Sequence, residues 1–391
     1  MTVHRRGRVR AMRALLLAGA LAGLSALGGC STLGYYWQSA TGHLALMHAA
    51  RPVDAWLQDP ATPDPLKARL ALAQQMRRFA AAELHLPDNA SYQGYADLQR
   101  PAAVWNVVAA PEFSLQLRQW CFPVAGCVGY KGYFDRAAAD AEAAQLRAQG
   151  LEVSVQPVPA YSTLGWSNWA GGDPLLNTFI GYPEGALARL IFHELAHQRV
   201  YVADDTTFNE SFATAVEQLG GARWLAAHGK PAAQAADALA QTRRRQFRAL
   251  TLDLQQTLRR VYGEASEDAE GLQEKPDRRH ADSTPAATPA QTEARRLLKS
   301  TALKDFARRY AELKAGWGGY AGYDLWADKV NNATLGTMSA YDALVPGFEA
   351  LFEKSDRDWP RFYAAVQQLA RMPKAVRHEA LRGHGSPHSR G

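Results

Sequence analysis

Two histidines four positions apart, with a glutamate thirteen residues after the second, constrain the fold most strongly. They lie in IFHELAHQRVYVADDTTFNESFATAVE, residues 191–217. Residues four apart share one face of a helix, so His193 and His197 project together from a helix that begins near Pro183. FNESFATAVEQLGGARWLAAHG predicts a second long helix, antiparallel to the first if the DDTT segment turns. The chain must therefore bring two helices side by side around these residues.

The spacing of these residues is typical of a metal site. Two imidazoles one turn apart can bind one ion, and Glu194, about 100° further round the helix, can reach a water molecule beside the metal. A catalytic zinc needs a third protein ligand and an open position, for which Glu210 is the first candidate. The pattern predicts one zinc ion per chain, with Glu194 as the general base.

Glu210 also has a purely structural interpretation. Thr207 and Glu210 match the capping box T-x-x-E, in which the glutamate reaches back to the Thr207 amide. Asp205 or Thr206 could cap the helix instead, which would leave Glu210 available to a metal. Asp204 or Asp205 could itself be the third ligand, as in zincins with an aspartate ligand. HExxH also occurs by chance on helices whose histidines are only packed and hydrogen-bonded.

The first residues indicate a targeting segment. Five arginines precede an apolar run from Ala14 to Leu27, which is too short to cross a membrane comfortably and is typical of a signal peptide over residues 1–29. The run ends in LGGC, which resembles a bacterial lipobox, so we expect Cys30 to be lipidated. An ordinary cleaved signal is the alternative. Ser31 resembles the lipoproteins sorted to the outer membrane, and we expect an envelope protein anchored there and facing the periplasm.

Removing this segment changes what the net charge implies. The chain has 44 Lys and Arg against 38 Asp and Glu, a formal net charge of +6. Five of the basic residues and none of the acidic ones lie in residues 1–29, so 39 against 38 leaves a net charge of +1. The charge therefore gives no reason to expect a nucleic-acid partner.

Two cysteines besides Cys30 lie close together in WCFPVAGCVGY. In an oxidising compartment, Cys121 and Cys127 predict a disulfide that closes a short loop through Phe-Pro and Gly. A zinc pair is the alternative, but no nearby histidine or cysteine completes a ligand set.

The segment before the predicted metal helix is mixed in character. Residues 30–100 predict a helical part, with a cap at Asp64-Pro65 and an apolar stripe after it. Residues 101–262 predict a mixed α/β part that carries the metal motif. Within it, AVWNVVAAPEFSLQL and LEVSVQPV are typical of strands, and RAAADAEAAQLRAQG is typical of a helix that ends at Gly150.

The C-terminal third alternates long helices with polar segments. Residues 263–293 have almost no large apolar side chains and predict a disordered loop between helices at about 231–262 and 292–314. Residues 294–372 predict a helical part, and residues 373–391 a disordered tail with solvated histidines, His378, His384 and His388. The predicted fold class is α+β and predominantly helical, with the metal helices beside a small β-sheet.

HELAH followed by NESFA resembles the gluzincin pattern, in which a glutamate on the second helix is the third zinc ligand. Longer segments, among them SYQGYADLQRPAAVWNVVAAPEFS, WCFPVAGCVGYKGYF and NNATLGTMSAYDALVPGFEALF, are similar to the putative aminopeptidase family of bacterial lipoproteins. The resemblance covers nearly the whole mature chain. It implies zinc bound by His193, His197 and Glu210, with Glu194 as base and a peptide or protein as substrate.

The sequence departs from this pattern in two places. The spacer before the third ligand is twelve residues, Gln198 to Asn209, and no motif that would anchor a substrate amine precedes the helix. SNWAGG is inserted between STLGW and DPLL. AYSTLGW could be an edge strand that pairs with substrate, or a core strand. Tyr341 is a candidate oxyanion donor, or a half-buried tyrosine at a helix start.

The sequence therefore predicts a zinc-dependent peptidase, expected to be an aminopeptidase that hydrolyses peptide bonds with metal-activated water. One alternative is an envelope metallo-endopeptidase, which needs a cleft open at both ends. Another is a non-catalytic lipoprotein with a structural metal or none. Glu194 argues against the latter, because a structural site has no need of a base.

Overall fold

A computed structural model of the 391-residue chain describes residues 34–122, 126–163, 168, 171–264 and 288–385. The chain divides into two compact units, Met1–Ala49 and Ala50–Gly391. In the first unit, residues 34–49 form a helix. The predicted signal peptide, Cys30 and most of the predicted loop at 263–293 lie outside the described residues. No described helix has the length and the apolar character that a membrane span requires.

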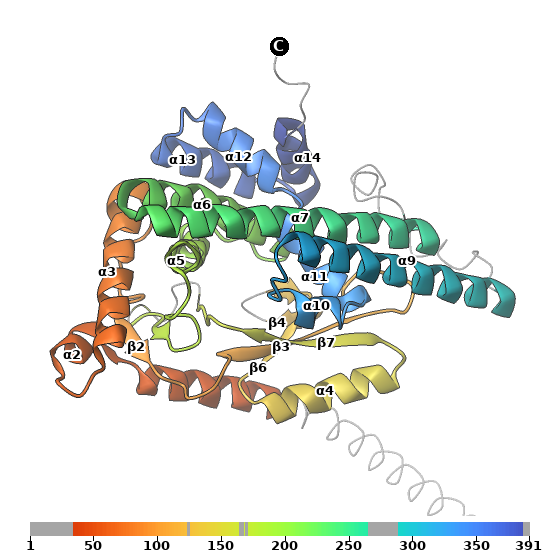
Figure 1. Cartoon of the computed structure of the whole chain (residues 1–391), viewed down its shortest axis with the longest axis horizontal. Helices are drawn as coiled ribbons and strands as arrows, with labels where there is room; N and C mark the ends of the chain where they lie inside the picture. Colours follow the sequence, from red (N-terminus) through yellow and green to blue (C-terminus); the bar gives the residue numbers. More distant parts are fainter. Residues whose placement is uncertain (1–33, 123–125, 164–167, 169–170, 265–287, 386–391) are drawn as a thin grey trace, which may run out of the picture. The chain divides into compact units, whose positions relative to one another are not determined.

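The second unit is predominantly helical, with small sheets, as the sequence predicted (Figure 1). Its helices are α2 (Val53–Gln58), α3 (Asp64–Leu84), α4 (Arg136–Ala148), α5 (Glu184–Arg199), α6 (Thr206–His228), α7 (Pro231–Tyr262), α9 (Pro289–Gly316), α10 (Asp324–Ala327), α11 (Asn332–Asp342), α12 (Val345–Lys354), α13 (Trp359–Ala370) and α14 (Lys374–Gly385). Its strands are β1 (Arg51–Pro52), β2 (Gly94–Ala96), β3 (Val104–Ala110), β4 (Trp120–Phe122), β5 (Gly126–Val128), β6 (Lys131–Tyr133), β7 (Glu152–Val158) and β8 (Leu175–Leu176).

One three-stranded sheet has the order β6-β3-β7, with both pairings antiparallel. Helix α4 packs on one face of this sheet and α11 on the other (Figure 1). Val108 and Ala110 of β3 pack against Ala333 of α11. The strand, helix and strand predicted in this region are therefore present. The turn after α4 has Gly150 at φ +82, a conformation that glycine adopts at little cost.

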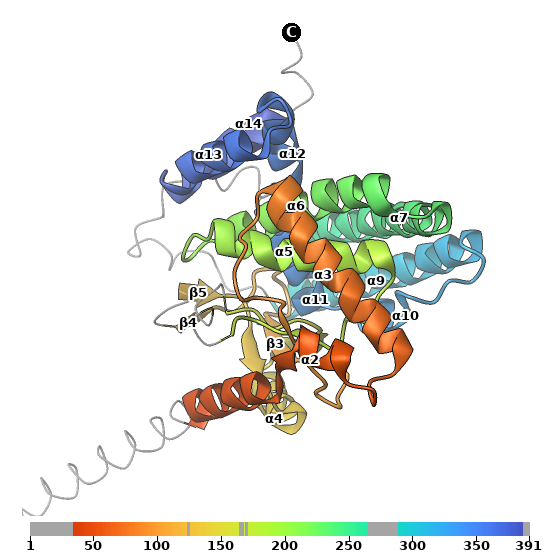
Figure 2. The same ribbon diagram turned by 90° about the vertical axis from the view of Figure 1, so that its left-hand side faces the viewer.

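Helices α5 and α6 form the centre of the helical part, and α3 packs across both (Figure 2). The close approach requires a small residue, because a Cβ at Gly220 of α6 would lie 2.7 Å from Leu84 Cδ1 and 3.1 Å from Phe192 Cδ2. On another side of α6, Phe208 and Phe212 pack against Phe348 of α12. Burying these aromatic side chains fixes the position of α6 against its neighbours.

Strands β4 and β5 form a separate hairpin in which Cys121 lies opposite Cys127. The two cysteines form a disulfide, as predicted. The hairpin contacts the turn between α5 and α6, because the Cys127 amide donates to Asp204 Oδ1 at 2.6 Å. The disulfide therefore supports a segment next to the candidate site.

The prediction of a disordered tail from residue 373 is wrong for the described residues 374–385, which form α14. The helix packs against α12, and its Leu381 is fully buried. His378 is also not solvated, since its Nε2 lies 2.9 Å from Asp205 Oδ2. A few buried side chains, whose partners are distant in the sequence, hold this helix in place. The Gly-, Ser- and Arg-rich composition of the segment gives no indication of these contacts. His384 lies 3.0 Å from Lys354 Nζ, and His388 lies outside the described residues.

Candidate metal centre

Helix α5 positions His193, Glu194 and His197. It begins at Glu184 after Pro183, as predicted, and its apolar side chains are fully buried against the rest of the unit, including Leu187, Ile191, Phe192 and Leu195. This burial fixes the rotation of the helix about its own axis. The two histidines therefore face α6, where their rings lie 4.8 Å apart, centroid to centroid.

Helix α6 is capped by Asp205, whose carboxylate accepts from the Phe208 amide at 3.2 Å. Thr207 is therefore not the cap, and the competing capping box is not formed. Glu210 Oε2 instead lies 3.4 Å from His193 Nε2 and 3.7 Å from His197 Nε2. The aspartates point elsewhere, since Asp204 accepts from Cys127 and Asp205 pairs with Arg377 and His378.

A tight turn joins the two helices, and Asn209 holds it. The Asn209 side chain donates to Val202 O at 2.7 Å and accepts from Val202 N at 2.8 Å. This pair of bonds folds the end of α5 back onto the first turn of α6. It explains how a spacer as short as twelve residues can return Glu210 to the histidines.

The three side chains converge on one point. His193 Nε2 and His197 Nε2 are 3.2 Å apart, and each faces Glu210 Oε2. Ligands bound to a tetrahedral zinc at about 2.1 Å lie about 3.4 Å from each other. The three separations therefore fit one tetrahedral ion. Among the described residues, this is the group of histidine and acidic side chains that could hold a metal.

A further carboxylate, Glu217, supports His193 from behind. Its Oε2 lies 2.9 Å from His193 Nδ1, and its Oε1 accepts from Arg244 Nη1 at 2.9 Å. An ionised carboxylate can only accept, so His193 donates from Nδ1 to Glu217, and Nε2, which faces Glu210, is the nitrogen that could bind a metal. Glu217 was not among the residues predicted from the sequence. The sequence feature that could have identified it is its spacing of seven residues from Glu210, which places both glutamates on one face of α6.

His197 has no matching support in the described part of the chain, where its buried Nδ1 has no hydrogen-bond partner. Burial lowers its pKa to about 4, which keeps the imidazole neutral, as a metal ligand must be. Burial also opposes charge on His193, but Glu210 and Glu217 together raise the pKa of His193 well above its ordinary value. The electrostatics of the cluster thus favour a positive charge between these two carboxylates.

Glu194 lies beside this cluster in a separate environment. Burial, with smaller contributions from Glu210 and Asp173, raises the pKa of Glu194 to about 7. The Ser162 hydroxyl hydrogen-bonds to Glu194, and fully buried Asp173 holds the same loop through Thr163 N at 3.1 Å. A carboxylate with a pKa near neutrality can take up and release a proton at the working pH of most proteins.

The described part of AYSTLGW, which supports Glu194, does not form the strand that the sequence suggested. Residues 160–163 have no strand structure, and residues 164–166 lie outside the described part. Of the SNWAGG insertion, Asn168 accepts from Ser91 Oγ at 3.0 Å, and Ser91 Oγ accepts in turn from Gln198 at 3.1 Å. The insertion is thereby tied to the end of α5.

Tyr92 is a second residue near the site that was not predicted from the sequence. It is buried, with φ at +63, an uncommon conformation for a bulky side chain. Two hydrogen bonds hold it there, from its amide to Asp173 O at 2.7 Å and from Gln74 Nε2 to its carbonyl at 2.6 Å. Its hydroxyl has no partner within the described residues. Burial, and after it the charge of Glu194, raises the pKa of this phenol well above its ordinary value, so it stays protonated.

The predicted oxyanion donor, Tyr341, belongs to α11, but its side chain lies outside the described part. Its role, like the lipidation of Cys30, therefore stays a prediction. The structure brings together His193, His197, Glu210 and Glu217, with Glu194 beside them.

The fold and site define a predominantly helical α+β protein with a histidine and glutamate cluster on two packed helices that could hold a metal ion. The model of the family described as "Putative aminopeptidase" matches residues 34–284 and 283–381. The chain belongs to this family, and membership supports a peptidase activity on peptide substrates. No curated protein and no solved structure matched the chain.

Proposed function

We propose that this protein is a zinc-dependent aminopeptidase of the gluzincin type. The observation that supports the proposal best is the convergence of His193 Nε2, His197 Nε2 and Glu210 Oε2, which lie 3.2 to 3.7 Å apart. His193, His197 and Glu210 would hold one zinc ion per chain. Glu217 would orient His193 and raise its basicity through the bond at Nδ1.

Zinc, when bound there, would polarise the substrate carbonyl and acidify a water molecule. The protein's own contribution to the chemistry lies mainly in Glu194. With a pKa of about 7, it accepts a proton from the attacking water and passes it to the amine that leaves. Ser162, hydrogen-bonded to Glu194, keeps the carboxylate in place during both transfers. The products are the released N-terminal amino acid and the shortened peptide.

The proposed location follows from the predicted lipobox. We propose that Cys30 is lipidated and holds the chain at the outer membrane of a bacterial envelope, facing the periplasm, where its substrates would be peptides or proteins. The Cys121–Cys127 disulfide is compatible with this oxidising compartment.

The test uses the full chain purified in detergent, with metal content measured by mass spectrometry and hydrolysis of leucyl-p-nitroanilide measured by absorbance. Glu194→Gln should keep the zinc and lose activity by about 10²- to 10⁴-fold, the range for general acid–base catalysis. Glu379→Gln, at an exposed position of α14, is the matched control and should keep both. Full activity of Glu194→Gln would contradict the mechanism. Cleavage of an N-terminally blocked peptide as fast as its unblocked form would mean that the protein is an endopeptidase and not an aminopeptidase.

A further inference from the structure

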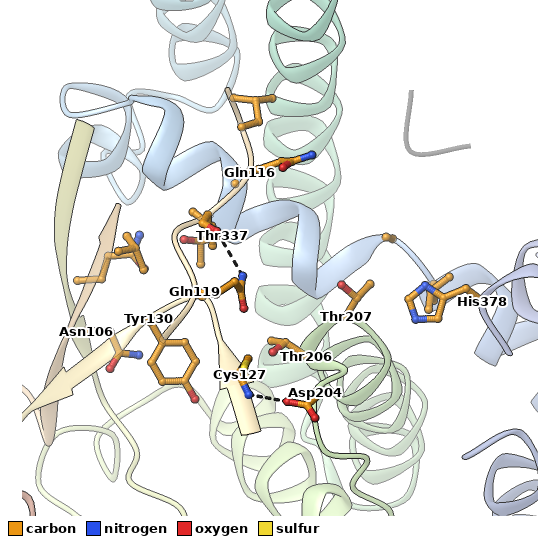
Figure 3. A pocket seen from close by; sticks show the side chains of 18 of the residues that line it. Asn106, Gln116, Gln119, Cys127, Tyr130, Asp204, Thr206, Thr207, Thr337 and His378 are labelled. Atoms are coloured by element: carbon orange, nitrogen blue, oxygen red, sulfur yellow. Dashed lines mark hydrogen bonds between the residues drawn. The ribbon is translucent and has the colours of Figure 1, made fainter. Parts of the chain in front are cut away.

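A cavity of about 770 Å³ lies next to the metal centre but contains none of its three ligands. Its lining comes from the β3–β7 sheet, the start of α6, α11 and α14. Figure 3 shows Asn106 and Tyr130 on one side of the cavity and Thr206, Thr207 and His378 on the other. Cavities of about 300–1,000 Å³ bind small molecules in many proteins, so this one can hold a peptide of a few residues.

Helix α6 connects the cavity to the metal centre. Thr206 and Thr207 line the cavity, and Glu210 follows them by four and three positions. Residues three and four apart share one helix face, so the cavity and the third candidate ligand lie along the same side of α6. A second connection between the cavity and the candidate site runs through the segment after β7. Pro159 lines the cavity, and three residues later Ser162 hydrogen-bonds to Glu194.

The sheet side of the cavity carries polar groups where a covered sheet face would be apolar. Strand β3 reads VWNVVAA, and Asn106 is its one polar residue. Asn106 lies opposite Gln156 of β7 in the register, so the two amides share one face of the sheet. Neither amide is hydrogen-bonded to a side chain or backbone atom in the part of the chain that the structure describes. Helix α11 covers Val108 further along the same face and leaves this pair open.

A half-buried pair of amides on a sheet face can both donate and accept, which is the pattern that a peptide main chain presents. The hydroxyls of Thr206 and Thr207 add the same capacity from the helix side. The chemistry of the lining therefore suits an extended peptide better than an apolar ligand.

We propose that this cavity binds the main chain of the substrate on the C-terminal side of the bond that is cut. The inference rests on the proposed function, because an aminopeptidase holds the first residue at the metal and must place the remaining residues elsewhere. Three to four helical residues rise about 5–6 Å, which two residues of extended chain can span. Peptides of four or more residues should therefore enter the cavity and contact its lining, whereas a dipeptide should not.

The experiment measures binding instead of turnover, so it does not depend on catalysis. The full chain carrying Glu194→Gln is titrated against leucyl peptides with one to six further alanines and a C-terminal fluorophore, by fluorescence anisotropy. Affinity should rise between two and four residues. Adding Asn106→Leu and Gln156→Leu should remove that rise and weaken binding of the six-residue peptide about tenfold, as expected for two lost hydrogen bonds. Gln145→Leu, at an exposed position of α4, is the control and should bind as the parent does.

If Asn106→Leu and Gln156→Leu disturb folding, as seen by circular dichroism, Thr207→Val tests the opposite side of the cavity and should also weaken the longer peptides. Binding that is independent of length, or unchanged by these three substitutions, would overturn the inference. If the chain binds peptides in this length-dependent way but never cleaves them, the cavity is supported and the proposed function fails.

Discussion

Two buried clusters of charged side chains lie along helix α6, and their negative charges are neutralised in different ways. At its first turn, Asp205 pairs with Arg377 and His378 of α14, with Lys374 at 3.8 Å. Further along, Glu210 faces His193 and His197, and Glu217 pairs with His193. Among the ion pairs described there, the permanent cation is Arg244, which pairs with Glu217. The first cluster is neutralised by the protein's own cations, which indicates a structural role. The second gathers more carboxylates than permanent cations, as a site for a divalent cation does.

Asp205→Ala should give the largest effect on stability and separate the two clusters. It leaves Arg377 and His378 without their buried partner and removes the cap of α6, at a cost of about 3–5 kcal/mol in the free energy of unfolding. Urea denaturation measures this cost. Asp140→Ala, which breaks an exposed ion pair on α4, is the control and should cost about 1 kcal/mol or less. If Asp205→Ala lost metal but kept its stability, the Asp205 cluster would not have the structural role assigned to it.

Glu217→Gln should act on the metal rather than on the fold. Glutamine keeps a hydrogen-bond acceptor near His193 Nδ1 but loses the charge and the pair with Arg244, so zinc affinity should fall about 10- to 100-fold. Competition with a chromogenic chelator measures the affinity, and Glu379→Gln serves again as the control. An unchanged affinity would mean that Glu217 supports only the packing of α5 against α6.

The pH dependence of the free energy of unfolding also tests the structural role of the Asp205 cluster, with a smaller expected effect. Burial alone would raise the pKa of Asp205, but His378, Arg377 and Lys374 of α14 hold it below its ordinary value of 3.8. A lowered pKa in the folded state gives stability that is fully present above the unfolded value and is lost as the pH falls through the folded value. The stability gap between the parent and Asp205→Asn should therefore be wide at pH 6 and narrow steadily below pH 4. A gap independent of pH would contradict the ion pairs.

The spacing of local residues predicted much of this arrangement. The shared face of His193 and His197 follows from helix periodicity, Glu210 was the first candidate on the next helix, and the cap at Asp205 was among the alternatives. Helix α7 at Pro231–Tyr262 and the β3–α4–β7 unit also follow from local patterns. Periodicity within one segment carries this information, because neighbours on a helix face are set by the chain itself.

What the sequence did not predict depends on contacts between distant segments. Helix α14 is held by Asp205, more than 170 positions earlier. Glu217 gains its role from His193 on another helix, and Tyr92 lies near Glu194 because Asp173 holds its backbone. No local pattern specifies such partners, since many glutamates and tyrosines have the same neighbours in sequence.

The measurement that tests the central claim most directly is the zinc content of Glu210→Gln. We expect this variant to fold with little loss of stability, because Asp205 caps the helix, and to bind zinc at least about tenfold more weakly than the parent. Equilibrium dialysis at buffered free zinc gives the affinity, and thermal unfolding of the metal-free protein gives the stability. Full zinc occupancy of Glu210→Gln would mean that Glu210 is not a metal ligand and would contradict the proposed site.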